Sequence, residues 1–168
     1  MPVTVFSFPN PVNEVSARLV AGGVVLLALL TIVTGQLWLT AVIAYGFVAR
    51  VLTGPTLSPL GQLVTRLITP RLPVAARPVA GPPKRFAQGI GAVVSVTAAV
   101  LSLGFGLDTA AYALLGLLVV AATLESVFGF CIGCKLFALL IRAGIIPAAI
   151  CERCNDIWGD RSGVSAAA

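Results

Sequence analysis

Four long apolar runs constrain the fold of this chain more than any other feature of its sequence. They cover residues 17–34, 37–52, 86–107 and 109–131. A helix needs about 20 mainly apolar residues to cross the roughly 30 Å hydrocarbon core of a bilayer. Inside that core every backbone N–H and C=O group must be hydrogen-bonded within the protein, so the runs are expected to be helical. The sequence therefore predicts an all-α membrane protein with a bundle of four transmembrane helices.

The composition supports this fold class and excludes several others. Hydrophobic residues make up 58% of the chain and charged residues 10%, whereas soluble domains have about 45–50% and about 25% of these. The mean hydropathy is +1.04. A disordered chain and an ordinary soluble enzyme are therefore excluded. The chain contains no histidine, which also excludes a histidine-based catalytic triad, metal site or proton shuttle.

Lysine and arginine are concentrated on one side of the predicted membrane. The connection 53–85 and the C-terminal region carry most of them: Arg66, Arg71, Arg77, Lys84, Arg85, Lys135, Arg142, Arg153 and Arg161. The opposite connections, 35–36 and 106–109, carry neither residue type. Because basic residues are retained on the cytoplasmic side, we expect a multi-pass protein of the cell inner (plasma) membrane with both termini cytoplasmic. The basic residues would then contact anionic lipid headgroups, and no nucleic-acid partner is expected.

Two further helices are predicted at the membrane surface. Ser58 followed by Pro59 is a helix-start signal. Apolar residues then recur at helical spacing at Leu60, Leu63, Val64, Leu67 and Ile68, which predicts an amphipathic interfacial helix in the cytoplasmic loop. Residues 135–150 are apolar but short and contain Arg142, so a short C-terminal interfacial helix is expected there. The small, polar tail 161–168 is expected to be disordered.

Small residues recur every four positions along the third run, at Ala87, Gly91, Ser95 and Ala99. In lipid such a stripe lets two helices approach closely. We therefore expect tight packing around this helix. The sequence leaves open whether the bundle also pairs as a homodimer.

The four cysteines are the strongest functional signal. They form two Cys-x-x-Cys pairs, Cys131 with Cys134 and Cys151 with Cys154, separated by 16 residues. By the distribution of charge, both pairs are expected at the cytoplasmic face. Because the cytosol keeps thiols reduced, a permanent structural disulfide is not expected.

Thiol chemistry is the interpretation we favour for these pairs. One thiolate of a Cys-x-x-Cys pair attacks a partner, and the second resolves the intermediate. The positive charges of Lys135 and Arg153 would lower a neighbouring thiol pKa. The predicted activity is thiol–disulfide exchange, or transfer of sulfane sulfur, with a soluble protein. Cys131 and Cys154 are expected to face the partner, and Cys134 and Cys151 to link the pairs.

Two other interpretations stay open. The spacing also suits a tetrahedral zinc site formed by all four cysteines, or an iron–sulfur cluster; otherwise no cofactor is expected. In that case the chain would be a non-enzymatic membrane protein whose C-terminal segment is closed onto the bundle. Cysteine also packs as a small apolar residue, so the thiols could be inert.

Glu125 is the other conspicuous residue, because a carboxylate inside a membrane span is costly and normally has a partner. Arg50 is predicted at similar depth in the second run, so we expect a Glu125–Arg50 contact. On an unbroken helix Glu125 would point away from Cys134, and it could act as a base only if the helix ended at Gly129. Together with the glycine-rich third run, Glu125 also leaves open a permease for a small sulfur-containing solute.

Three stretches of the chain, residues 78–91, 125–135 and 151–154, resemble an uncharacterised bacterial, mostly actinobacterial, family of multi-pass membrane proteins catalogued as a domain of unknown function. The likeness runs from about Val12 to Asp156. It implies a small membrane protein without an established activity. It further implies gene neighbours that encode thioredoxin-like and rhodanese-like proteins, which would supply a soluble partner for thiol or sulfur handling. No site residue is carried over from the family.

Overall fold

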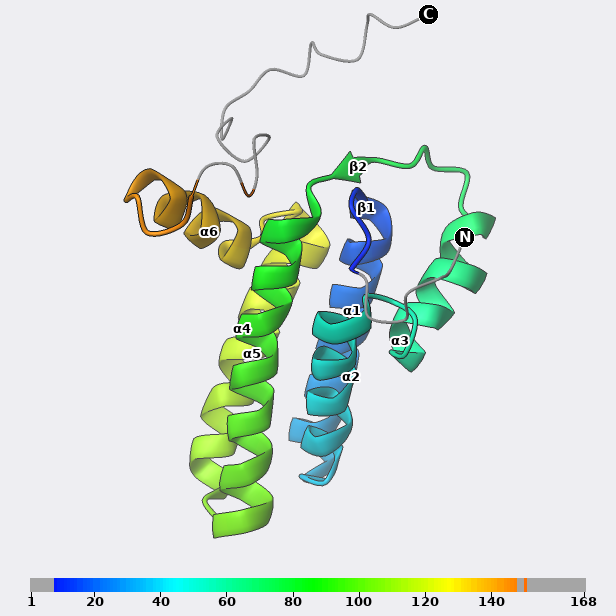
Figure 1. Ribbon diagram of the computed structural model, residues 1–168. Helices are drawn as coiled ribbons and strands as arrows, with labels where there is room; N and C mark the ends of the chain where they lie inside the picture. Colours follow the sequence, from blue (N-terminus) through cyan, green and yellow to red (C-terminus); the bar gives the residue numbers. More distant parts are fainter. Residues whose placement is uncertain (1–7, 148–149, 151–168) are drawn as a thin grey trace, which may run out of the picture.

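Four helices lie side by side in the computed structural model, which describes residues 8–147 and 150 (Figure 1). They are α1 (Glu14–Thr34), α2 (Leu39–Thr53), α4 (Gly81–Ala99) and α5 (Asp108–Phe128). Helix α1 packs against α2 and α5, and helix α4 packs against the same two helices. Each helix therefore contacts two others, and the four form a closed ring around a small core.

Three of these helices are long and apolar enough to cross a membrane: α1, α5, and α4 together with its continuation η3 (Val100–Gly104). The prediction of a helical membrane protein is thus confirmed. The predicted second span corresponds to an apolar helix, α2, which has only 15 residues and is shorter than the three helices that could cross a membrane. It begins at Leu39 rather than at residue 37, because the tight turn after α1 occupies residues 35–38.

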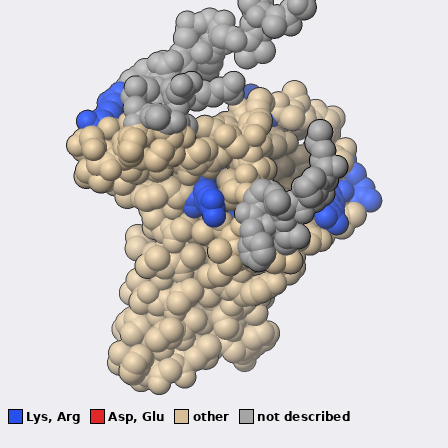
Figure 2. Space-filling model, viewed as in Figure 1, with Lys and Arg blue, Asp and Glu red and all other residues tan. Residues whose placement is uncertain are grey.

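The outer surface of the bundle is apolar. Leu26, Val33 and Phe105 have 71%, 82% and 71% of their surface exposed, whereas the core consists of residues such as Ala28 and Leu115 that are fully enclosed. A surface of this kind is stable when lipid rather than water surrounds it. On the face drawn in Figure 2, Lys and Arg side chains lie at one end of the molecule, and the lower part of the bundle carries none. The arrangement indicates a bilayer environment.

The loop between α2 and α4 lies at the charged end of the bundle (Figure 1). The predicted helix start is confirmed: the Ser58 side chain accepts a hydrogen bond from the Gly61 N–H, and α3 (Pro59–Gln62) follows. The chain continues as the π-helical segment η1 (Leu63–Ile68) and the short turn η2 (Thr69–Arg71).

A two-residue antiparallel pair joins the start of the chain to the connector that precedes α4. Strand β1 (Val12–Asn13) pairs with β2 (Pro78–Val79), with Val12 opposite Val79. The pair holds the N-terminal segment against the charged end of the bundle.

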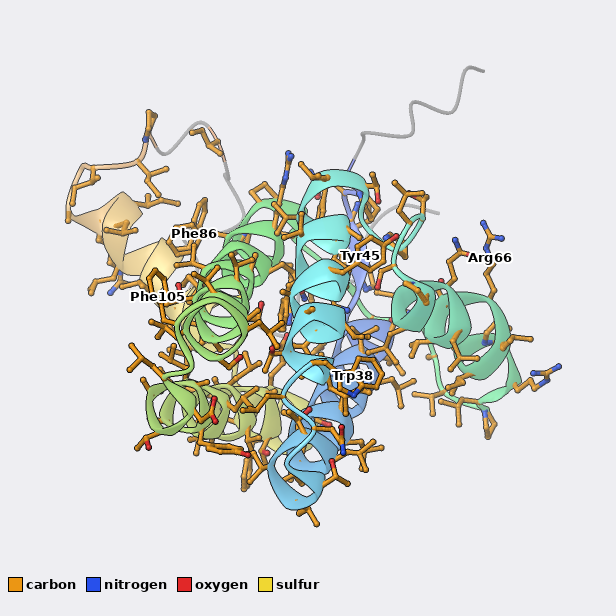
Figure 3. All side chains as sticks on the ribbon, turned by 90° about the horizontal axis from the view of Figure 1, so that it is seen from below. Trp38, Tyr45, Arg66, Phe86 and Phe105 are labelled. Carbon is orange, nitrogen blue, oxygen red and sulfur yellow. The ribbon has the colours of Figure 1, made fainter. Side chains whose placement is uncertain are left out.

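The last described helix, α6 (Ile132–Arg142), projects sideways from the charged end of the bundle (Figure 1). It packs on α4, where the rings of Phe137 and Phe86 have centroids 5.4 Å apart; Phe86 lies on the α6 side of the bundle in Figure 3. It begins three residues before the predicted start at 135. The second cysteine pair, Cys151 and Cys154, and the tail 161–168 lie outside the described residues.

The small-residue stripe of α4 brings this helix close to α2. A Cβ atom added at Gly91 would lie 2.3 Å from Cε1 of Phe47, which is closer than any real contact. Along the same helix Ser95 is almost fully buried. The predicted tight packing around this helix is confirmed at Gly91 and Ser95.

Replacing Gly91 with alanine is expected to lower the free energy of unfolding by about 1–3 kcal/mol, because the added methyl group overpacks the α2–α4 contact. Gly89→Ala is the matched control, because a Cβ there meets nothing within 4 Å. It is expected to stabilise the same helix by about 0.5–1 kcal/mol. The free energies of unfolding of the two variants are compared in a neutral detergent by titration with sodium dodecyl sulfate, followed by circular dichroism. Equal effects of the two substitutions would contradict the tight packing at Gly91.

Candidate functional site

The C-terminus of α5 turns the chain toward the first cysteine pair. Gly129 adopts the left-handed conformation, with a φ of 67°. The Gly129 N–H bonds to the Glu125 carbonyl at 3.1 Å, and the Phe130 N–H bonds to the Leu124 carbonyl at 3.0 Å. This glycine-terminated helix end satisfies carbonyls that would otherwise be unpaired. The helix therefore ends at Gly129, which is the break that would let Glu125 approach the thiols.

Arg18 of α1 stabilises the same helix end. Its Nε donates to the Ser126 carbonyl at 3.0 Å and its Nη2 to the Val127 carbonyl at 2.7 Å. A cation at a helix C-terminus also interacts favourably with the helix dipole. The position at which the chain leaves α5 is thus held by a charged contact from a neighbouring helix.

Cys131 is the N-cap residue of α6. Its backbone is extended, and its Sγ accepts a hydrogen bond from the Cys134 N–H at 3.3 Å. Helix N-termini stabilise a thiolate, because free N–H groups and the helix dipole point at the sulfur. Cys131 is only 7% exposed, and Cys134 is half-buried. Cys131, which was expected to face a partner, is therefore more buried than Cys134.

The two thiols have opposite electrostatic properties. A hydrogen bond from Cys134, the positive charge of Lys84 and the Cys134 N–H lower the pKa of Cys131, and together they outweigh the opposing effects of burial and of Glu125. The hydrogen bond to Cys131, followed by burial, raises the pKa of Cys134. Cys131 is therefore the thiol that forms a thiolate first, and Cys134 is the one that keeps its proton.

Glu125 forms an ion pair with Lys84, not with Arg50. The Lys84 Nζ lies 2.7 Å from Glu125 Oε1, and the two side chains are 10% and 15% exposed. The prediction that Glu125 has a basic partner holds, but the partner is Lys84 rather than Arg50. The reason is that α4 begins at Gly81, so that Lys84 lies in its first turn, beside α5. Arg50 donates from Nε to Gln88 Oε1 at 3.0 Å instead.

Lys84 was missed as the partner of Glu125 because it was assigned to the connection 53–85, ahead of the predicted third span that begins at residue 86. The signal was available. Pro82 and Pro83 occupy the first positions of α4, and proline is favoured there because no helical hydrogen bond is lost. The same rule correctly identified the helix at Ser58. Applied to residues 82–83, it would have assigned Lys84 to the helix.

Two cavities meet at Cys131. The first, which we call the cysteine cavity, has a volume of about 370 Å³ and includes Glu14, Lys84, Cys131, Cys134 and Lys135 in its lining. The second, the bundle cavity, has a volume of about 260 Å³, lies between the helices and includes Arg50, Gln88, Glu125 and Cys131 in its lining. Although Cys131 is largely buried, it therefore forms part of the wall of both cavities.

Gly133 anchors the cysteine motif to α4. A Cβ atom at this position would lie 2.6 Å from the Ala87 Cα, so the N-terminus of α6 contacts the α4 backbone directly. Only glycine permits this approach without a shift of one helix. The Cys-Ile-Gly-Cys sequence thus positions both thiols on a packed element.

Residues 12–142 match a family described as "Domain of unknown function (DUF4395)". The chain belongs to this family. The resemblance inferred from the sequence is confirmed for this segment, whereas the bacterial and actinobacterial distribution stays a prediction. No curated protein matches the chain, and no solved structure matches it.

The DUF4395 match covers the four bundle helices, α6 and the first cysteine pair, and it ends before Cys151 and Cys154. Among the residues that the structure describes, no group of three or more Cys, Asp, Glu or His side chains is arranged to hold a metal ion. The four-cysteine zinc or iron–sulfur site needs the second pair, which lies outside those residues. That site stays a prediction, as does the homodimer.

Proposed function

We propose that this DUF4395 protein spans the inner membrane four times, with both termini and the Cys131–Cys134 pair on the cytoplasmic side. The one-sided distribution of Lys and Arg supports this orientation. The short helix α2 packs along α1 and α4, and it would serve as the fourth span at the same depth as its neighbours. The exposed apolar residues of η1, such as Leu63 and Leu67, suit an interfacial helix, as does the position of α6 at the charged end.

Its activity would be thiol–disulfide exchange through Cys131 and Cys134. The observation that carries this proposal is the position of the Cys131 Sγ, which accepts the Cys134 N–H at the start of α6 and lies on the wall of the cysteine cavity beside Lys84. A depressed pKa on the attacking thiol and a raised pKa on the second thiol suit the two successive steps of exchange.

The reaction would proceed in two attacks at sulfur. The Cys131 thiolate attacks a partner disulfide R–S–S–R′, the bond Cys131–S–S–R forms, and R′–S⁻ leaves. Cys134 then loses its proton and attacks the Cys131 sulfur, so that an intramolecular disulfide forms and R–S⁻ leaves. One disulfide is reduced and two thiols are oxidised. With a persulfide R–S–SH, the first step would instead transfer the terminal sulfur to Cys131 and release the thiol R–SH.

The soluble partner would be a thioredoxin-like or rhodanese-like protein. The lysines that line the cysteine cavity, Lys84 and Lys135, would favour the anionic thiolate or persulfide of such a partner. A side chain that enters the cavity could reach Cys131 without exposure of this residue on the outer surface.

A vesicle experiment tests orientation and exchange together. The variant Cys151→Ser/Cys154→Ser retains only the first pair, and a membrane-impermeant methanethiosulfonate is applied to inside-out and right-side-out vesicles. In inside-out vesicles we expect both thiols to be consumed, because the mixed disulfide on one cysteine is displaced by the other, and dithiothreitol should restore both. The remaining thiols are counted after denaturation from the gel shift that maleimide–polyethylene glycol produces, and a cysteine-free variant gives the background.

Two results would contradict the proposal. Consumption of the thiols only in right-side-out vesicles would reverse the orientation. Accumulation of the reagent on the protein without formation of an internal disulfide would exclude exchange by this pair.

A further inference from the structure

Arg50 is a buried cation whose hydrogen-bond partners among the described residues are all neutral. It is 6% exposed; its Nε donates to Gln88 and its Nη1 to Ser58 Oγ at 3.3 Å. Its guanidinium carbon also lies 4.5 Å from the centre of the Phe47 ring. Burying an uncompensated charge is costly, so such groups normally have an ion of opposite sign beside them.

The local charge balance leaves one positive charge over. Among the described residues, Glu125 forms its ion pair with Lys84, and its single negative charge also attracts Arg50, so two cations share one carboxylate. Arg50, Lys84 and Glu125 together carry one net positive charge when Cys131 is a neutral thiol. The surroundings of Arg50 are therefore suited to one additional monoanion.

Space for such an anion lies directly beside the guanidinium. Arg50 and Gln88 line the bundle cavity, and they also line a second cavity of about 350 Å³ under the loop helices. Most of the bundle cavity is apolar, with walls from residues such as Val24, Phe47 and Leu118. Its polar end and apolar body match an amphiphilic molecule.

We propose that the bundle cavity binds a small organic monoanion, a carboxylate with an apolar body, through Arg50 and Gln88. A guanidinium presents paired N–H donors that match the two oxygens of a carboxylate. An engineered cavity of about 150 Å³ holds benzene, so by proportion a cavity of about 260 Å³ holds about ten non-hydrogen atoms. The inference does not require that the thiols exchange disulfides, but its charge balance applies to the state in which Cys131 is protonated.

Equilibrium dialysis of radiolabelled octanoate against the purified full-length chain in an uncharged detergent tests the proposal. Octanoate has the proposed size and charge, and octanamide is its neutral counterpart. We expect octanoate to bind at least about tenfold more tightly than octanamide, because only the anion pairs with Arg50. Arg50→Gln should remove this difference, and Arg50→Lys should retain part of it.

Arg66→Gln is the matched control, because Arg66 is exposed and points away from the bundle (Figure 3). This variant should bind octanoate like the wild type. If Arg50→Gln does not fold, as judged by circular dichroism, Gln88→Leu replaces it and should weaken octanoate binding several-fold while octanamide binding is unchanged.

Three outcomes would overturn the proposal. The first is equal binding of octanoate and octanamide, and the second is undiminished octanoate binding by a folded Arg50→Gln or, in its place, Gln88→Leu variant. The third is displacement of octanoate by phosphatidylglycerol at lower concentrations than by unlabelled octanoate, which would assign the cavity to a lipid headgroup rather than to a small carboxylate.

Discussion

Replacing Cys131 with serine is expected to slow disulfide exchange by at least about a hundredfold, because the activated nucleophile is lost. Replacing Cys134 with serine should have a different effect. Cys131 would still attack, because its thiolate is also stabilised by Lys84 and by the backbone N–H of residue 134. The reaction would then stop at the mixed disulfide, because the resolving thiol is absent.

The pH dependence of the first step gives a second measure of the same asymmetry. The rate of attack follows the thiolate fraction, which rises with pH and levels off above the pKa. Because the pKa of Cys131 is lowered, its rate should level off at a lower pH than that of an ordinary cysteine. Removal of the Lys84 charge should move the profile to higher pH.

Both effects can be measured with the Cys151→Ser/Cys154→Ser background in detergent, with a chromogenic aromatic disulfide as substrate. Stopped-flow absorbance gives the rate of the first attack, and mass spectrometry detects the trapped adduct. A trapped adduct on Cys134 in the Cys131→Ser variant, formed at the wild-type rate, would contradict the assignment of Cys131 as the attacking thiol.

Replacing Lys84 with methionine is expected to lower the free energy of unfolding by about 3–5 kcal/mol, because Glu125 would remain buried without its partner. The geometry supports a cost of this size, since the pair is short and both side chains are mostly buried. Methionine retains most of the side-chain volume, so the loss of charge is the main change.

The double variant Lys84→Met/Glu125→Leu separates charge from packing. Buried ion pairs are often replaced by apolar residues with little change in stability, so the double variant should lie within about 1 kcal/mol of the wild type. Lys135→Met is the control, because Lys135 is exposed and should change stability by no more than about 0.5 kcal/mol. Unfolding with sodium dodecyl sulfate measures all four proteins; a double variant that is no more stable than Lys84→Met would argue against a coupled pair.

The helices and their order could be predicted from the sequence, because each depends on signals close together in the chain. The apolar runs, the Ser58 cap and the tight turn between α1 and α2 are local features of this kind. Helix ends were predicted less well. Cys131 was placed inside the fourth span, because the αL conformation of Gly129 and the capping role of the Cys131 thiol leave no mark in an apolar pattern.

The candidate site was predictable only in part. The first cysteine pair stands out by its spacing, and Glu125 by its charge within an apolar run. Their partners could not be assigned, because the choice between Lys84 and Arg50 depends on how α4 is rotated against α5. Gln88 and Ser58 both accept hydrogen bonds from Arg50. Gln88 gave no sequence signal, and Ser58 gave only that of a helix cap, because uncharged polar residues are common in and around membrane helices.

The amino-acid sequence by itself determined that this chain is a helical membrane protein with its basic residues at one end, because hydropathy and charge act residue by residue against lipid and water. The tertiary structure alone decided which charges meet, which thiol is activated and where the cavities lie. These properties depend on distances of a few ångströms between helices that are far apart in the chain. The pattern of residue types along the sequence does not specify such distances.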